Sequence, residues 1–232
     1  MGVTLAFSVP RLVLMIIGFV PIMSLCVALF QLVSLPATLI VLILPSMAIA
    51  GVVATRHPTL GVEALLGLMA GMMATGLYDL IRFGFILGGM WQDFIPSIGR
   101  LALNTPDASP LWGYLWRYVG NGGAMGMTFM LLSWRGARTG MLYGTAICCC
   151  LFGTLLWAPD AQLILFRLTP LSAVGALGGH LVYGAVLGEL TRLMHCRSAS
   201  SPQRSRILGS QTHRTTEIPV AHGASLERPG VA

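Results

Sequence analysis

The sequence predicts an all-α protein, a polytopic transmembrane bundle of about six helices. Of its 232 residues, 55% are hydrophobic and only 9% are charged, whereas soluble domains carry about 25% charged residues. The mean hydropathy is +0.79. Long apolar runs are separated by short breaks of proline, glycine and arginine, and most runs approach the ~20 residues that a helix needs to cross a bilayer. We therefore expect the lipid bilayer to be the main partner of the chain.

Each expected helix follows from one such run. The first apolar stretch is too long for the ~7–15-residue apolar region of a signal peptide, and Gln31 to Pro36 divide it into two spans. Arg56, His57 and Pro58 end the second span. The expected spans are residues 12–34, 37–55, 61–89, 111–134, 141–158 and 171–194. Together they form one bundle over residues 1–196, with an interfacial helix and loop at 91–110 and a disordered cytoplasmic tail at 197–232.

The arginines predict the orientation of the bundle. All 14 basic residues are arginines, and cytoplasmic loops of membrane proteins are enriched in them. With six spans, one side of the membrane carries Arg11, Arg56, Arg135, Arg138, Arg192 and Arg197. The other carries Arg100 and Arg167, together with Trp91, Trp112, Trp116 and Trp157, as an interfacial belt would. Both termini are therefore expected in the cytoplasm, and the tryptophans at the outer interface.

An acid and a base lie near the end of the third span. At ~1.5 Å per residue, Asp79 lies roughly 27 Å along this helix, and Arg82 follows one turn later. The fourth span runs in the opposite direction, so Arg117 and Asn121 near its start lie at a similar depth. One carboxylate and two guanidiniums would form a positive outer vestibule able to bind an anionic group. The alternative is a structural ion pair in which the arginines extend to the lipid headgroups.

His180 is the deepest titratable residue, near the middle of the sixth span. A histidine at this depth can relay protons or ligate haem, with Tyr183 and Glu189 following toward the cytoplasm. The alternative is a neutral imidazole that makes an interhelical hydrogen bond. No second histidine lies in a span, so we predict no multi-histidine metal site.

The remaining residue types do not indicate a cofactor. The five cysteines, Cys26, Cys148, Cys149, Cys150 and Cys196, are predicted to be free thiols. The methionines of the third and fourth spans are interpreted as core filler. We therefore predict no metal and no cofactor, with haem at His180 as the open alternative. No Gly-x-Ser-x-Gly elbow, His-Glu-x-x-His pair or phosphate loop indicates an enzyme, and the basic tail contains no aromatic residue of the kind expected in a nucleic-acid site.

Four short segments resemble a group of uncharacterised small bacterial multi-span inner-membrane proteins. They are Tyr78-Asp79-Leu80-Ile81-Arg82, Asp93-Phe94-Ile95-Pro96-Ser97-Ile98-Gly99, Tyr118-Val119-Gly120-Asn121-Gly122 and Gly179-His180-Leu181-Val182-Tyr183-Gly184-Ala185. In that group a histidine often stands at the position of Tyr118. The resemblance covers roughly the third to sixth spans and implies the fold and the inner membrane, but no mechanism.

Three functions follow as hypotheses. The first is a transport or solute-binding bundle that uses Asp79, Arg82, Arg117 and Asn121, and that forms a homo-oligomer through its glycine-rich helix faces. The second is a membrane redox or haem-associated subunit that uses His180. The third is a non-catalytic accessory subunit of a larger membrane complex.

Overall fold

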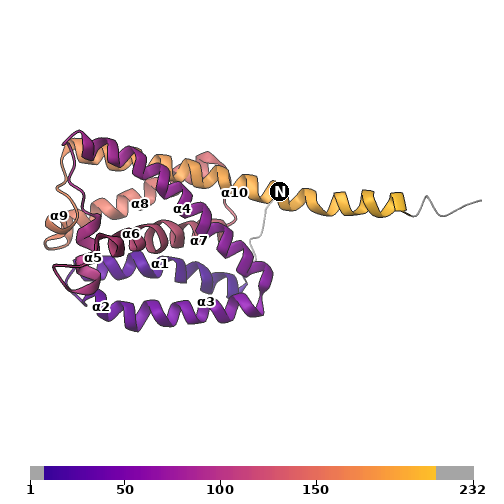
Figure 1. The fold of residues 1–232 in the computed structure, drawn as a ribbon, viewed down its shortest axis with the longest axis horizontal. Helices are drawn as coiled ribbons and strands as arrows, with labels where there is room; N and C mark the ends of the chain where they lie inside the picture. The colour runs from indigo at the N-terminus through magenta and orange to yellow at the C-terminus, as the bar shows by residue number, and fades with distance from the viewer. Residues whose placement is uncertain (1–7, 213–232) are drawn as a thin grey trace, which may run out of the picture. The chain divides into compact units, whose positions relative to one another are not determined.

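The regular structure of the chain is entirely helical in the part that is described. The computed structural model describes residues 8–212, with side chains for residues 8–196. Its contacts divide the chain into a bundle, Met1–Met194, and a second unit, His195–Ala232. The elements are α1 Val9–Leu29, α2 Leu35–Thr38, η1 Leu39–Ile43, α3 Leu44–Arg56, α4 Pro58–Leu87, α5 Ile95–Leu103, α6 Pro110–Leu115, η2 Trp116–Gly123, α7 Ala124–Leu131, α8 Ala137–Trp157, α9 Ala161–Ile164 and α10 Pro170–Thr212 (Figure 1).

Five helices among the described residues are long and apolar enough to cross a membrane. They are Val9–Leu29, Leu35–Arg56, Pro58–Leu87, Ala137–Trp157 and Pro170–Cys196. They correspond to five of the six expected spans, with ends that differ by a few residues. This composition is that of a multi-pass membrane protein. The remaining expected span, 111–134, is helical from Pro110 to Leu131 but is divided by the π-helical segment η2, and it is not one of the five.

Prolines explain several of the helix boundaries. Proline occupies the first or second helical position of α1, α4 and α6, where its missing N–H is not needed. Pro45 lies inside the second long helix and cannot donate to the carbonyl of Val41. The backbone widens to the π-helix η1 over Leu39–Ile43, immediately before this proline. Pro36 and Pro45 therefore shape the helix without ending it.

The stretch α6–η2–α7 lies inside the bundle. Every residue of α7 is buried, and Figure 1 shows α6 and α7 running between α1 and α4. Within the segment 91–110, where the sequence predicts an interfacial helix, the chain forms the helix α5, at the same end of the bundle as α9 (Figure 1). In contrast, α3 has no buried residue. The inward position of the fourth helical stretch agrees with the polar residues Arg117 and Asn121 in its sequence.

Glycines allow two helix pairs to pack with their backbones in contact. A Cβ atom at Gly71 of α4 would overlap the carbonyl oxygen of Gly122. Likewise, a Cβ at Gly140 of α8 would overlap the carbonyl of Gly184 on α10. Gly67 and Gly126 extend the first contact in the same way. These faces, through which the sequence predicts self-association, are therefore occupied within one chain, and a homo-oligomer stays a prediction that would need another surface.

Two further expectations differ in detail from the structure. Trp91 and Trp116 are buried, while Trp112 and Trp157 are exposed, so only the latter pair is placed to face a lipid interface. The helix α10 continues to Thr212, whereas the sequence predicts disorder from Arg197. No glycine or proline stands between Gly188 and Pro202, so nothing stops the helix at Cys196. The remainder of the expected tail, 213–232, lies outside the described residues.

Candidate functional site

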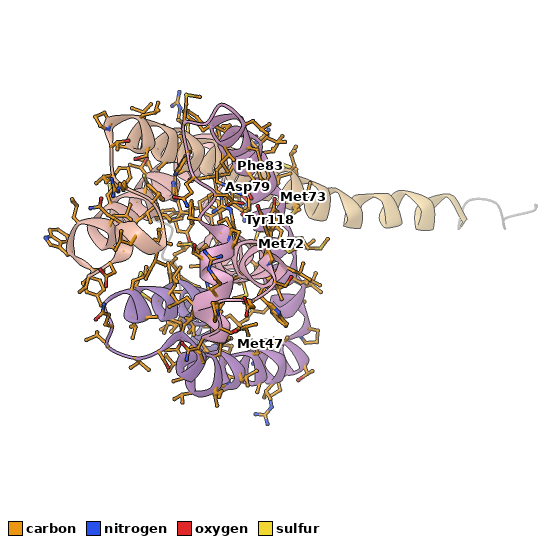
Figure 2. The ribbon with its side chains drawn as sticks, turned by 60° about the vertical axis from the view of Figure 1, so that its left-hand side comes forward. Met47, Met72, Met73, Asp79, Phe83 and Tyr118 are labelled. Atoms are coloured by element: carbon orange, nitrogen blue, oxygen red, sulfur yellow. The ribbon has the colours of Figure 1, made fainter. Side chains whose placement is uncertain are left out.

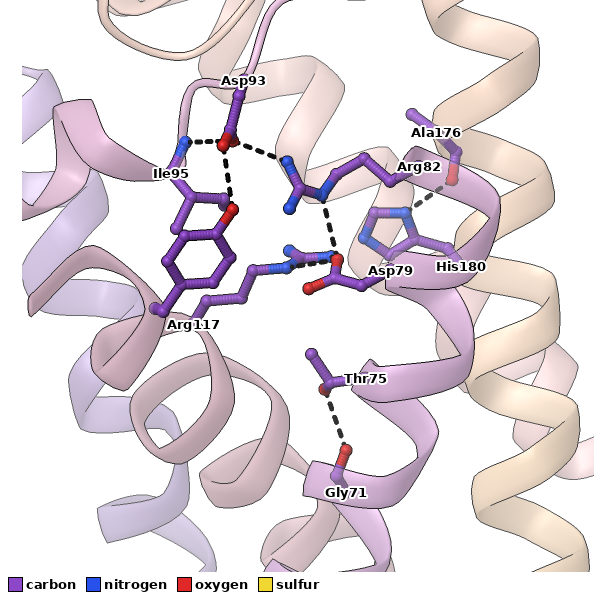
Figure 3. A network of polar contacts seen from close by, with 10 residues as sticks. Gly71, Thr75, Asp79, Arg82, Asp93, Ile95, Arg117, Ala176 and His180 are labelled. Atoms are coloured by element: carbon purple, nitrogen blue, oxygen red, sulfur yellow. Dashed lines mark hydrogen bonds and ion pairs between the residues drawn. The ribbon is translucent and has the colours of Figure 1, made fainter. Parts of the chain in front are cut away.

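The charged residues at the end of α4 form one hydrogen-bonded network with η2 (Figure 3). Oδ1 of Asp79 accepts hydrogen bonds from Nε of Arg82 at 3.0 Å and from Nε of Arg117 at 2.7 Å. Arg82 is one turn along the same helix, while Arg117 comes from the π-helical segment. The contacts that the sequence predicts among these three side chains are therefore present.

Asp93, in the loop before α5, completes the network. Its Oδ1 accepts from Nη1 of Arg82 at 2.7 Å and from the backbone N–H of Ile95 at 3.1 Å. Its Oδ2 accepts from the hydroxyl of Tyr114 at 2.9 Å. Burial alone would raise the pKa of this carboxyl group, but the hydrogen bonds from Arg82, Tyr114 and Ile95 outweigh burial and lower it. Asp93 therefore joins α4, α5 and α6 as a carboxylate.

Burial and charge distinguish the network from the predicted vestibule. The side chains of Arg82 and Asp79 are 0% and 1% exposed, whereas those of Arg117 and Asp93 are 12% and 29% exposed. The sequence prediction set one acid against two arginines and expected a positive site. With Asp93 included, two carboxylates balance two guanidiniums, so the network is electrically neutral.

Aromatic rings enclose the two guanidiniums. The guanidinium of Arg117 lies 4.5 Å from the ring centre of Tyr78, and that of Arg82 lies 4.7 Å from the ring centre of Phe83, within the range of a cation–π contact. Tyr118 lies close enough to Asp79 to interact with it electrostatically, and Figure 2 shows both residues away from Met47 on α3. These rings reduce the access of water to the charges.

A cavity of about 400 Å³ lies beside the network, between helices of the bundle, and it is partly open to the outside. Most of its wall is apolar, with Phe19, Ile22 and Leu25 of α1 facing Ile147 and Leu151 of α8. Its polar wall combines residues from α4, η2 and α10, namely Thr75, Tyr78, Arg117, Asn121, His180 and Tyr183. Asp79 and Arg82 are not among its lining residues. Of the predicted vestibule, Arg117 and Asn121 thus face the cavity, and the pair on α4 lies behind them.

Asn121 and His180 contribute hydrogen-bonding groups to this wall. Oδ1 of Asn121 is buried without a hydrogen-bond partner among the described residues. Nδ1 of His180 lies 2.7 Å from the carbonyl oxygen of Ala176. Because a carbonyl can only accept, Nδ1 carries the proton, and Nε2 of the neutral ring is then an acceptor. The His180 ring packs edge-on against Tyr78, with the ring centres 5.2 Å apart.

The remaining predicted site residues, Tyr183 and Glu189, lie in different parts of the bundle. The hydroxyl of Tyr183 donates to the carbonyl of Gly122 at 2.8 Å and so joins α10 to η2 beside the cavity. Glu189 accepts from Nε of Arg192 at 2.7 Å and from the backbone N–H of Ala137 at 3.0 Å, which links α10 to the start of α8. The structure brings His180 and Tyr183 into one cavity wall, and it does not bring Glu189 there.

Sequence reasoning missed Asp93 as a member of the site, because the sequence assigns it only to the mixed loop after the third span. A usable signal is present, since an Asp shortly before a helix start often bonds to the N–H groups of the first turn. Cys26 of α1, which the sequence predicts only to be a free thiol, also lines the cavity, with its Sγ 3.6 Å from Oγ1 of Thr154.

Within the described part of the chain, no group of three or more His, Cys, Asp or Glu side chains is placed to hold a metal ion. Comparison of the chain with known protein families, curated proteins and solved structures found no match.

Proposed function

We propose that this chain is a six-span protein of the bacterial inner membrane, with both termini in the cytoplasm, that binds and transports a small, mainly apolar solute. The observation that supports this most is the 400 Å³ cavity with Arg117, Asn121 and His180 on one wall. Ligand sites in proteins are typically clefts of about 300–1,000 Å³ with apolar walls and a few polar groups. The cavity has this size and this distribution of polar groups.

The span that brings the number to six is the fourth in chain order, the stretch Pro110–Leu131. Its 22 residues, taken from the bounds of α6, η2 and α7, extend about 33 Å at ~1.5 Å per residue, enough to cross the hydrocarbon core. Its polar residues face the bundle interior and not lipid, as expected for polar groups inside membranes. With this span included, the distribution of arginines supports a cytoplasmic location for both termini.

The π-helical segment is the part of this span that bears the ligand-facing residues. Short π-helical turns are uncommon and often occur at functional sites. Arg117 and Asn121 both lie in the wider backbone of η2 and line the cavity. Gly122, in the same segment, permits the close approach of Thr75 on α4. The local geometry of η2 thus supports a binding role for this wall.

Photolabelling in phosphatidylcholine nanodiscs tests the proposal. The probes are three tritiated decyl chains with a diazirine at the far end and a carboxamide, sulfonate or trimethylammonium head. We expect saturable labelling of the bundle by at least one of them. Ala146→Trp adds a large side chain at the cavity wall and should abolish this labelling.

Leu142→Trp is the matched control. Leu142 lies one turn earlier on α8 and is 69% exposed on the outer surface of the bundle, so this substitution should leave labelling unchanged. If no probe labels saturably, or if the two tryptophan variants behave alike, the proposal is wrong.

A haem-bearing redox subunit is the second candidate, because the unprotonated Nε2 of His180 is the kind of nitrogen that binds iron, and His180 lines the cavity. A visible absorbance spectrum of protein purified from bacterial membranes decides between the two. A Soret band that is lost in His180→Ala would favour haem. A colourless preparation that binds the decyl probes would favour solute binding.

A further inference from the structure

The charge balance of the site indicates whether the head group of its ligand is charged. This inference rests on the function proposed above. Arg117 is the only charged side chain among the residues that line the cavity. Its Nε donates to Asp79, and its Nη2 also faces that carboxylate. The positive charge that meets the cavity is therefore already paired.

The neighbouring charges are also balanced. Arg82 bonds to Asp79 on one side and to Asp93 on the other, so the four groups sum to zero. Their side chains are between 0% and 29% exposed. At an effective dielectric constant of about 20, one uncompensated charge ~5 Å from a bound ion changes the binding energy of that ion by more than the amount that corresponds to a tenfold change in affinity. A charged ligand head would therefore be left without a counter-charge in a poorly solvated place.

The unused hydrogen-bonding groups indicate what the head must supply. Nη2 of Arg117 lies beside Oδ1 of Asp79 but is buried without a hydrogen-bond partner among the described residues, so the guanidinium still has a donor to offer a ligand. Four residues later on η2, Oδ1 of Asn121 is buried and accepts none. His180 adds a second acceptor through Nε2. A matching head accepts one hydrogen bond and donates another, and it carries no charge.

We propose that the cavity binds uncharged amphiphiles, an apolar chain or ring system with a primary amide or hydroxyl head. The head accepts from Arg117 and donates to Asn121, and Asp79 sets the preference against anions by neutralising Arg117. This replaces the anionic cargo expected from the sequence, because that expectation omitted Asp93 and assumed that one guanidinium was unpaired.

The three decyl probes test the charge preference directly. Wild-type protein in nanodiscs should bind the carboxamide at least about tenfold more tightly than the sulfonate or the trimethylammonium probe. Asp79→Asn keeps the shape of the side chain and removes one negative charge. We expect it to raise sulfonate affinity about tenfold or more relative to the carboxamide. Asp107 is an exposed acid in the loop before α6. Asp107→Asn is therefore the matched control and should leave the order of the three probe affinities unchanged.

Arg117→Met is the opposite variant, since it leaves one carboxylate in excess and should favour the trimethylammonium probe over the sulfonate. A wild-type protein that binds the sulfonate best, with saturable labelling abolished by Ala146→Trp, would overturn the uncharged-head proposal and leave the solute-binding function intact. Loss of saturable labelling with all three probes would instead contradict the function itself. The order in which the wild-type protein binds the three probes tests the uncharged-head proposal even if one of the variants fails to fold.

Discussion

Arg82 holds the C-terminal end of α4 to the loop that precedes α5. Its guanidinium lies between Asp79 and Asp93 with 0% of the side chain exposed. Removing one partner from a buried ion pair typically costs about 3–5 kcal/mol, because the other charge remains buried. We expect Arg82→Met to lower the free energy of unfolding by this amount, as measured by thermal unfolding in nanodiscs.

The exposed Arg167 provides the control for this substitution, and Arg167→Met should change stability little. Arg82→Met combined with Asp93→Asn should recover part of the loss, because the variant then retains one balanced pair, Asp79 with Arg117. Equal melting temperatures for the two single arginine variants would contradict the structural role of Arg82.

Asp93 makes stability depend on pH in a specific direction. Its pKa is lowered in the folded protein, chiefly by hydrogen bonds from Arg82 and Tyr114 that outweigh burial. A lowered pKa stabilises the fold above the ordinary aspartate pKa of about 3.9, and the stabilisation is lost as the pH falls through the lower folded value. We expect Asp93→Asn to cost about 1 kcal/mol at pH 7, given the partial exposure. The difference from wild type should shrink as the pH falls below the ordinary aspartate value and disappear below the folded pKa of Asp93, and a constant difference would refute the assignment.

At the level of single residues, depth along a helix was sufficient to predict that Asp79, Arg82 and Arg117 meet. Helical rise and alternating span direction fix those positions. Asp93 was not predictable in this way, because a loop has no periodicity and its path depends on tertiary contacts. The same reason explains the error in the predicted charge of the site.

The packing of α4 against η2 and α7 depends on the absence of side chains where these segments cross. Gly71→Ala places a Cβ against the carbonyl of Gly122, which should force the backbones apart at a cost of about 1–3 kcal/mol. Gly76 lies on the same helix, and a Cβ added there would meet nothing within 4 Å. Gly76→Ala should be neutral or slightly stabilising, since alanine favours helix by up to about 1 kcal/mol. Thermal unfolding of both variants checks this contrast, and similar losses in both would contradict it.

Hydropathy and prolines located most elements to within a few residues, because each apolar run must be long enough to cross the bilayer. The π-helical segments were not predictable from periodicity alone. η1 depends on the missing N–H of Pro45, and η2 accompanies close contacts with α4 that only the folded bundle provides. The glycine faces are recognisable as packing surfaces, but the sequence does not indicate that their partners lie in the same chain.

For the whole molecule, the six-span topology predicts that Asp107 and Arg135 lie on opposite sides of the membrane. Both residues are exposed at the two ends of the stretch Pro110–Leu131. In a cysteine-free background, Asp107→Cys should react with a membrane-impermeant maleimide applied to spheroplasts. Arg135→Cys should react only after the membrane is permeabilised. Equal labelling of both cysteines in intact spheroplasts would show that this stretch does not cross.

The central claim is that a lipophilic solute binds inside the bundle and not merely at its lipid-facing surface. The most direct measurement is mass-spectrometric mapping of the residues that the decyl carboxamide probe modifies on irradiation. Binding in the cavity predicts adducts on cavity residues such as Met125, Ile147 and Leu151, and their loss in Ala146→Trp. Adducts confined to exposed residues such as Ile40, Val41 and Met47, unchanged by Ala146→Trp, would contradict it.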